Sequence, residues 1–354
     1  MDQRPMPITR QASAALDLLR LSAALTVFLH HVNWLGLDGG ALSWFRRDVG
    51  HSAVVIFFVL SGYLISATSR RDRPMDYAIK RASRIYSVAV PAIALTVLLD
   101  AFSVAWQLPV QLQQYELHRP LVYAAFSLVF AGDFWSLGVP AFSNVPVWSL
   151  GYEVWYYIVF GVALFGRGTA RVVGVALLLA LIGPKLWVLF PIWLGGVAAE
   201  RLAARRPLPV PVARAVAVGA VAAFLILKAL HVEDAINDAV AAAWPGFVAG
   251  LRFSQWFVGD WLVGVLTVAL VYALATAEVP MSRRMRAVVV AGAGVSFSLY
   301  LVHFPLLQVF GQLLPGPAAA ALALTVAAGF GAVFEPLRSP LRRLLSSRLT
   351  PAKA

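Results

Sequence analysis

The chain has 354 residues, of which 60% are hydrophobic and only 13% are charged, whereas soluble domains have about 45–50% and about 25%. This composition excludes a soluble globular enzyme. The sequence contains no cysteine, which excludes disulfides, cysteine-bound zinc and a thiol acyl-enzyme. The formal net charge of +12 is typical of nucleic-acid-binding proteins, and also of membrane proteins whose cytoplasmic loops are rich in Lys and Arg. The positions of the basic residues therefore decide what the charge means.

Apolar segments suited to crossing about 30 Å of hydrocarbon recur along the whole chain, so the sequence predicts an all-α, polytopic transmembrane helical bundle of about ten spans. A further apolar stretch, residues 120–136, contains Asp133 and Trp135, and these polar and aromatic residues favour an interfacial or re-entrant segment. The predicted spans are residues 14–35, 50–68, 85–105, 148–166, 171–185, 187–203, 211–230, 256–277, 289–310 and 317–337.

The distribution of basic residues predicts the orientation. Most of the 29 Lys and Arg residues fall in the tails and in alternate loops, which is the pattern of cytoplasmic segments. A crossing at 120–136 would move either the basic cluster at 69–84 or the later basic loops outside, against that rule. We therefore expect both termini in the cytoplasm and one membrane domain over 1–354, with a core at 10–340, a short basic tail at 341–354 and no appended soluble domain. Topology explains the charge, so no nucleic-acid partner is expected.

The first predicted span carries four ionisable residues, Asp17, Arg20, His30 and His31, which is costly in hydrocarbon and marks functional candidates. Arg20 and His31 are eleven residues apart, so they share a helix face at a separation of roughly 16 Å along the axis. Asp17 precedes Arg20 by three residues and is positioned to pair with it, so a structural ion pair is one interpretation of these two. His30 faces about 100° away from His31, and we expect an interfacial or packing role for it.

Two later predicted spans also carry ionisable groups. Glu153 follows Trp148 by five residues and is a candidate to orient a histidine or to transfer a proton; a carboxylate that extends to the interface is the alternative. Tyr300 and His303 lie on adjacent turns of one face, and Pro305 frees backbone carbonyls beside them. A packing histidine bonded to those carbonyls is the alternative for His303. In the predicted topology, His31, Glu153 and His303 all lie in the outer half of the membrane.

Arg81 and Arg84 are one helical turn apart at the start of the third predicted span. Guanidinium groups at this spacing suit the bidentate capture of phosphate, although a basic cluster that only sets the topology has the same appearance. The sequence has no GxxxxGK[ST] loop, no HExxH motif and no metal-ligand set of histidines and carboxylates, so we expect no metal and no nucleotide hydrolysis.

Several short motifs occur in one order along the chain. They are Leu19-Arg20 with His31; FFVLSGYLI at Phe57–Ile65; Arg81, Arg84 and Ile85; Asn144, Trp148, Ser149, Leu150 and Glu153; Ser296, Ser298, Tyr300, His303 and Pro305; and Glu335-Pro336. Together they resemble the integral-membrane acyltransferase-3 family, whose members O-acylate polysaccharides, peptidoglycan and some secondary metabolites. The resemblance covers residues 15–340, and it departs from the family pattern at Ser87, where proline is usual.

The resemblance implies a multi-pass enzyme of the cell inner membrane that moves an acyl group, expected to be acetyl, from cytoplasmic acyl-CoA to a hydroxyl of a glycan or lipid-linked glycan. His31 is expected to act as a general base or to form a transient acyl-imidazole, and the sequence leaves both open. The residues assigned to the chemistry are His31, Arg20, Glu153 and His303; to acyl-CoA, Arg81 and Arg84; and to the substrate, Asn144, Trp148, Ser149 and Tyr300.

The competing function is a transporter or flippase, in which the same intramembrane His and Arg residues line a proton or substrate path. The sequence shows no internal repeat of the kind that many transporters carry. Modification of an acceptor at the expense of acyl-CoA would distinguish the enzyme from a transporter, which moves its substrate unmodified. A membrane scaffold without chemistry is disfavoured because many polar groups lie at membrane depth.

Overall fold

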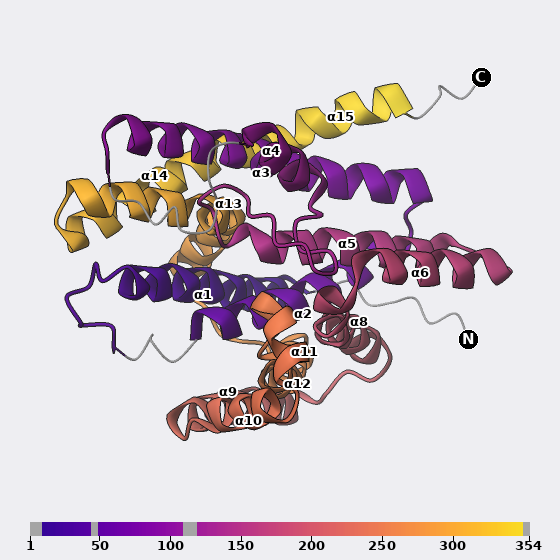
Figure 1. Cartoon of the computed structure of the whole chain (residues 1–354). Helices are drawn as coiled ribbons and strands as arrows, with labels where there is room; N and C mark the ends of the chain where they lie inside the picture. Colours follow the sequence, from indigo (N-terminus) through magenta and orange to yellow (C-terminus); the bar gives the residue numbers. More distant parts are fainter. Residues whose placement is uncertain (1–8, 44–48, 109–118, 350–354) are drawn as a thin grey trace. The chain divides into compact units, whose positions relative to one another are not determined.

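The computed structural model describes residues 9–43, 49–108 and 119–349, and in these ranges the chain is all-helical, with no strand (Figure 1). The predicted fold class is therefore confirmed. The helices are α1 (Arg10–Trp34), α2 (Val49–Ser69), α3 (Pro74–Ala105), α4 (Pro120–Val129), α5 (Val147–Phe165), α6 (Gly168–Ile182), α7 (Pro184–Trp187), α8 (Phe190–Arg205), α9 (Val210–Ala229), α10 (Val232–Ala243), α11 (Pro245–Gly250), η2 (Arg252–Ser254), α12 (Phe257–Leu274), α13 (Arg283–Leu313), α14 (Gly316–Phe334), η3 (Glu335–Leu337) and α15 (Arg338–Leu349).

Nine helical segments in the described ranges are long and apolar enough to cross a membrane, with α7–α8 and α14–α15 each counted as one. They correspond to nine of the ten predicted spans. The remaining one, predicted at 171–185, is α6, which has 15 residues and is about 22 Å long, shorter than the roughly 20 residues of a typical span. The apolar stretch at 120–136 contains α4, whose 10 residues are too few to cross the bilayer.

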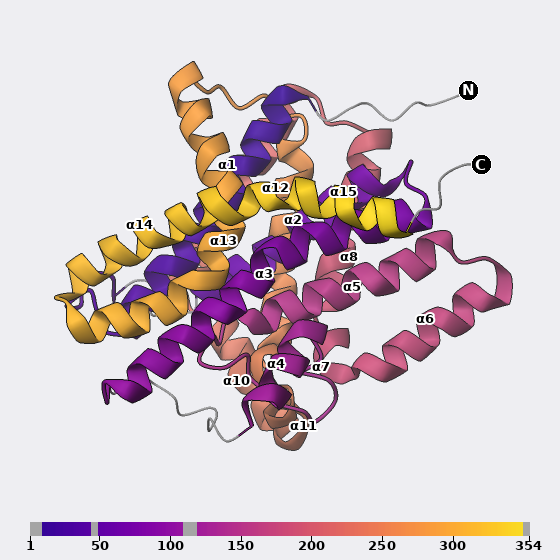
Figure 2. The same ribbon diagram turned by 90° about the horizontal axis from the view of Figure 1, so that it is seen from above.

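One predicted boundary is corrected by the structure, and the fold of the C-terminal segment is added to it. The third span was expected to begin at residue 85, but α3 begins at Pro74, where proline suits the first helical turn. Arg81 and Arg84 therefore lie inside a helix and not at its start. Most of the segment 341–354, expected to be a short basic tail, is helical and belongs to α15, which packs against α3 (Figure 2). Residues 350–354 lie outside the described residues.

The chain forms two compact units. Unit 1 contains the first part of α1, then α2, the helices α7 to α12 and the first part of α13. Unit 2 contains the rest of α1, the helices α3 to α6, the rest of α13, and α14 to α15. Their bounds are Met1–Leu25, Arg47–Arg70 and Pro184–Ala293 for unit 1, and Thr26–Arg46, Arg71–Gly183 and Gly294–Ala354 for unit 2.

In unit 1, α2 and α8 approach closely because both have glycine at the contact. A Cβ atom on Gly62 would lie 2.0 Å from the carbonyl oxygen of Trp193, and a Cβ atom on Gly196 would lie 2.0 Å from that of Val59. No other residue fits at these two positions without moving a backbone, which is how small residues bring membrane helices together. The contact between α2 and α8 therefore depends on glycine at both positions.

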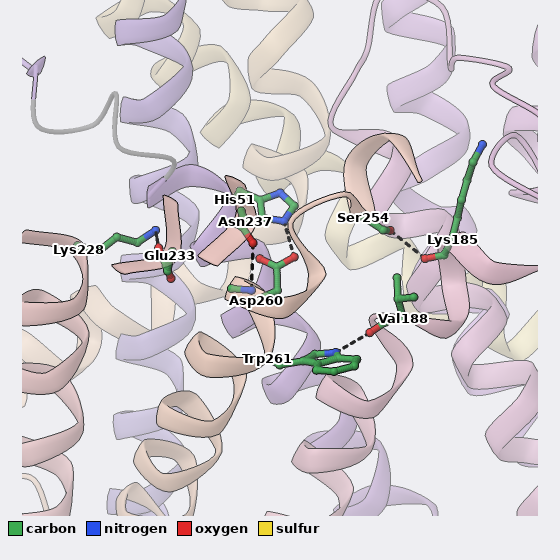
Figure 3. A network of polar contacts seen from close by, with 10 residues as sticks. His51, Lys185, Val188, Lys228, Glu233, Asn237, Ser254, Asp260 and Trp261 are labelled. Atoms are coloured by element: carbon green, nitrogen blue, oxygen red, sulfur yellow. Dashed lines mark hydrogen bonds and ion pairs between the residues drawn. The ribbon is translucent and has the colours of Figure 1, made fainter. Parts of the chain in front are cut away.

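Unit 1 also holds a partly buried polar network (Figure 3). Nε2 of His51 lies 3.0 Å from Oδ2 of Asp260, and Oδ1 of Asn237 accepts a hydrogen bond from the backbone N–H of Gly259. Lys228 forms an ion pair with Glu233. Burial raises the pKa of Glu233, and the charge of Lys228 acts in the opposite direction. The network connects α2, α9, α10 and α12 and satisfies groups that would be costly to bury alone.

Unit 2 contains an irregular segment, residues 130–146, between α4 and α5. Phe130, Trp135 and Phe142 adopt positive φ there, a conformation that costs energy for large side chains and is common at functional sites. The segment is anchored because Phe130 O accepts from Trp155 Nε1, and Trp135 Nε1 donates to the carbonyl oxygen of Ala180. It thus follows the surface of α5 and α6 and leads into the start of α5.

Candidate active site

Two histidines from opposite ends of the sequence meet in unit 2. His31, near the end of α1, places Nδ1 3.1 Å from Nε2 of His303 in α13. His303 is buried, with 1% of its surface exposed. His31 is partly exposed, and the rings of Phe304 and Trp34 lie against it edge to face. The pair therefore lies in an aromatic enclosure that remains open on the side of His31.

Hydrogen bonds determine the tautomers of this pair. Nδ1 of His303 lies 2.8 Å from the carbonyl oxygen of Tyr300 and 3.0 Å from that of Leu299, and because a carbonyl oxygen only accepts, this nitrogen must carry a proton. In the neutral ring, Nε2 of His303 is then the acceptor for Nδ1–H of His31. Nδ1 of His31 also lies 2.9 Å from the carbonyl oxygen of Val27, which likewise requires a proton on this nitrogen. Nε2 of His31 is consequently the nitrogen with the free lone pair.

Tyr300 and Ser149 form the next polar group of the site. The hydroxyl of Tyr300 donates to the carbonyl oxygen of Pro146 at 3.0 Å and lies 2.6 Å from Oγ of Ser149. Oγ of Ser149 also lies 3.3 Å from the same carbonyl oxygen, so the two hydroxyls share the Pro146 acceptor and a hydrogen bond with each other. Trp148 packs edge to face on Tyr152. Tyr300 thus connects α5 with α13, and the centre of its ring lies 6.1 Å from that of His303.

Asn144 occupies a position set by Pro305. Proline has no N–H, so the carbonyl oxygen of Leu301, four residues earlier in α13, loses its helical donor. Nδ2 of Asn144 donates to that oxygen at 2.7 Å and to Oγ1 of Thr96 at 3.1 Å. Asn144 is 1% exposed. The structure therefore places this residue, predicted to bind substrate, where it fixes the irregular segment to α3 and α13.

Glu153 and Arg81 belong to a series of polar side chains that continues along α5 and α3. The hydroxyl of Tyr157 donates to Oε1 of Glu153, and Tyr157 O accepts from the hydroxyl of Tyr77 at 2.9 Å. The guanidinium of Arg81 lies over the ring of Tyr77, 5.5 Å from its centre, a cation–π geometry. The series connects the basic half of α3 with the helix that carries Ser149.

Comparison with known proteins was made with this geometry in hand. The acyltransferase-3 family, described as "Acyltransferase domain", matches residues 13–334. The chain belongs to the acyltransferase-3 family. It is 35% identical over 159 residues to a protein described as "O-acetyl transferase" from Shigella phage Sf6, and the match covers 43% of this chain and 46% of the phage protein. No solved structure matches.

The first helix of this acyltransferase-3 member carries the remaining predicted residue. Nη1 of Arg20 lies 3.5 Å from Oδ1 of Asp17, and both side chains are about one-fifth exposed. The pairing expected from their three-residue spacing is present. Arg20 belongs to unit 1 and His31 to unit 2, although one helix carries both. The other predicted site residues all fall in unit 2.

Sequence reasoning did not assign the partners of the residues in this candidate site. It placed His31 and His303 at similar depth but did not pair them. It predicted that Glu153 orients a histidine or transfers a proton, which stays a prediction, and it did not foresee the hydrogen bond from Tyr157 to that carboxylate. It also left Glu335 without a role. Oε1 of Glu335 accepts from the hydroxyl of Ser298 at 3.1 Å. A carboxylate near the end of an apolar span was the signal that could have identified it.

Proposed function

We propose that the protein transfers an acetyl group from cytoplasmic acetyl-CoA to a hydroxyl of a glycan or lipid-linked glycan, with Nε2 of His31 as the general base. The family supports acyl transfer, and the name of the phage relative supports acetyl as the group and oxygen as the acceptor atom. The observation that carries the proposal is the pair of tautomers that the hydrogen bonds assign to His303 and His31. With a proton on each Nδ1, the more exposed histidine, His31, keeps a lone pair on Nε2.

The reaction has a simple balance. The acceptor hydroxyl gives its proton to Nε2 of His31 while its oxygen attacks the thioester carbonyl. A C–O bond forms, the C–S bond breaks, and the same proton passes from Nε2 to the departing sulfur, so that free CoA leaves as a thiol. Nδ1–H of His31 remains bonded to His303 throughout, and this hydrogen bond orients the ring and stabilises the imidazolium that forms between the two steps.

The proposed site for the acetyl-CoA donor rests on the negative charge of its phosphate groups. CoA carries phosphate groups, and Arg81 and Arg84 in the first third of α3 provide guanidinium groups for them. The polar series of Tyr77, Tyr157 and Glu153 supports a path for the pantetheine arm from these arginines towards α5. Nine candidate spans and the family indicate a multi-pass membrane protein, and we propose the bacterial inner membrane, with the arginines on the cytoplasmic side.

The first test measures acetyl-CoA binding and transfer with the purified full chain and membranes that supply the acceptor. Alkali-labile incorporation of radiolabelled acetyl into the glycan or lipid fraction reports an ester. We expect His31→Ala to lower transfer by about 10²- to 10⁴-fold while acetyl-CoA binding persists. The matched control is His30→Ala, which removes the neighbouring imidazole on another face of α1 and should retain transfer.

A second variant, Arg81→Ala/Arg84→Ala, addresses the donor and should lose acetyl-CoA binding. Full transfer by the His31 variant would remove this residue from the chemistry. Absence of acetyl-CoA binding by well-folded wild type would remove the donor, and movement of unmodified glycan across vesicles would then favour a transporter.

A further inference from the structure

The C-terminal helix lies along the basic half of α3. Helix α15 and the turn η3 before it both contact α3, and Figure 2 shows α15 running beside α3. Arg338 and Arg342 are four residues apart in α15 and therefore share a helix face. Both charges lie within electrostatic range of each other, and Arg338 also lies within range of Arg84 in α3.

This group of charges is not balanced. Glu335 is the carboxylate that interacts with Arg84 and Arg338, and its Oε1 is bonded to the backbone N–H and hydroxyl of Ser298. In the described part of the chain, the three guanidinium groups of Arg84, Arg338 and Arg342 make no ion pair or hydrogen bond. Three like charges with one carboxylate repel one another, and this repulsion is relieved when an anion binds among them.

The carboxylate of Asp72, just before α3, does not neutralise the group, because it is paired with Lys80. Arg81 of α3 lies over the ring of Tyr77 and adds a further positive charge. The excess positive charge therefore remains where α15 packs against α3, with Arg338 of α15 and Arg84 of α3 within electrostatic range of each other. Such an arrangement suits a ligand with more than one phosphate, because each guanidinium can hold two oxygens of a phosphate group.

The group of Arg84, Arg338 and Arg342 is also connected to the helix that carries His303. Ser298, to which Glu335 is bonded, precedes His303 in α13 by five residues, which is about 7.5 Å along the helix. The basic group is thus joined by one hydrogen-bonded carboxylate to the helix that carries the site histidine.

We infer that α15 forms the second wall of the phosphate site, with Arg338 and Arg342 binding the phosphates of acyl-CoA opposite Arg84. The inference rests on the proposed function and extends it to a helix that has no assigned role. The chemistry recognised is a cluster of phosphate groups. An anionic phospholipid headgroup shares that chemistry, so the experiment has one arm for each source.

The experiment compares two double variants of the full-length protein in which α15 loses the same charge. Arg338→Gln/Arg342→Gln removes the arginine within electrostatic range of Arg84 and the arginine that interacts with it one turn further along α15, whereas Arg343→Gln/Arg348→Gln removes two exposed arginines outside this group. Affinity for CoA and for dephospho-CoA is measured by calorimetry in neutral detergent. Affinity for phosphatidylglycerol is measured in the same detergent by native mass spectrometry, and thermal denaturation checks that each variant is folded.

We expect the first variant to bind CoA at least tenfold more weakly and the control to bind within about twofold of wild type. Arg338→Lys/Arg342→Lys, which keeps the charge and the fold, should bind CoA with intermediate affinity, because lysine lacks the bidentate geometry. A smaller loss of affinity for dephospho-CoA than for CoA would assign the arginines to the 3′-phosphate.

Unchanged CoA affinity in the first variant would overturn the inference, and so would a loss confined to phosphatidylglycerol, which would make the helix a lipid-binding element. These results leave the proposed function intact as long as wild type binds CoA and Arg81→Ala/Arg84→Ala does not. If folded wild type itself fails to bind CoA, the proposed function and the inference both fall.

Discussion

At the scale of single residues, the central feature is a chain of hydrogen bonds that starts at a backbone carbonyl and ends at a free lone pair. The carbonyl oxygens of Leu299 and Tyr300 fix the proton on Nδ1 of His303, and His303 in turn accepts from His31. In the mechanism that we propose, a neutral histidine takes the place that a carboxylate occupies in catalytic triads, where the carboxylate orients the base and stabilises its charged form. His303 is a positioning residue in that mechanism, because it acts through His31.

This role predicts the behaviour of His303→Gln. The glutamine fills the space but removes the imidazole acceptor, so we expect kcat to fall by about 10²-fold while KM for acetyl-CoA changes little. The pH profile of kcat should also move, since His31 loses the partner that stabilises its imidazolium. Steady-state kinetics from pH 5.5 to 9 measures both effects, with His30→Gln as the control. A rise in KM without a change in kcat or in the pH profile would contradict a positioning role.

At the scale of elements, glycine determines how α2 and α8 meet. The two backbones touch at Gly62 and Gly196, and Oγ of Ser66 donates to the buried Glu200, which Arg70 also binds at 2.6 Å. Small residues permit the approach, and the polar contacts near one end of the interface fix its register.

We therefore expect Gly62→Ala to destabilise unit 1. The added Cβ atom would lie 2.0 Å from the backbone oxygen of Trp193, so the helices must separate, at a cost of about 1–3 kcal/mol. Gly219→Ala in α9 is the control, since a Cβ atom there has no neighbour within 4 Å and alanine favours helix by about 1 kcal/mol. Thermal denaturation in detergent should show a lower Tm for the first variant and an equal or higher Tm for the second. Equal Tm values for both variants would contradict close packing at this contact.

At the scale of the whole molecule, the number of crossings depends on α6. By length alone, α6 falls short of a span. It nevertheless packs against α5 and runs back beside α5 in both views (Figures 1 and 2). The end of α6 lies next to Trp135, whose Nε1 donates to the carbonyl oxygen of Ala180. Because residue 135 lies in the segment that leads into the start of α5, α6 returns to the side from which α5 began. Counting α6 as a crossing restores ten, the parity that the basic loops predicted.

Labelling of single cysteines tests this count, and the chain has no native cysteine to interfere. With ten crossings and a cytoplasmic N-terminus, a membrane-impermeant maleimide applied to intact cells should label Ala41→Cys. It should label Thr169→Cys and Ser282→Cys only after permeabilisation. All three positions are exposed. Labelling of Ser282→Cys in intact cells would show that α6 does not cross. Residue 282 follows α6 in the chain, so the loss of one crossing would move it to the outer side.

The sequence by itself determined the properties that depend on local chain order. Apolar runs predicted the all-helical membrane bundle, helical periodicity predicted the pairing of Asp17 with Arg20, and the residue types around His31, Arg81 and His303 identified the family before any geometry was known. These features could be predicted because they depend on composition and on spacings of a few residues within one helix.

Only the tertiary structure decided which of these groups meet. The contact between His31 and His303 joins residues 272 positions apart, and no helical period relates residues on separate helices. The same holds for Asn144, which replaces the donor that Pro305 lacks, and for α15, which the sequence presented as a tail and the fold places beside α3. Local chemistry selects the helices, whereas the packing of their side chains selects the partners, because contacts between distant segments depend on how whole helix surfaces fit together.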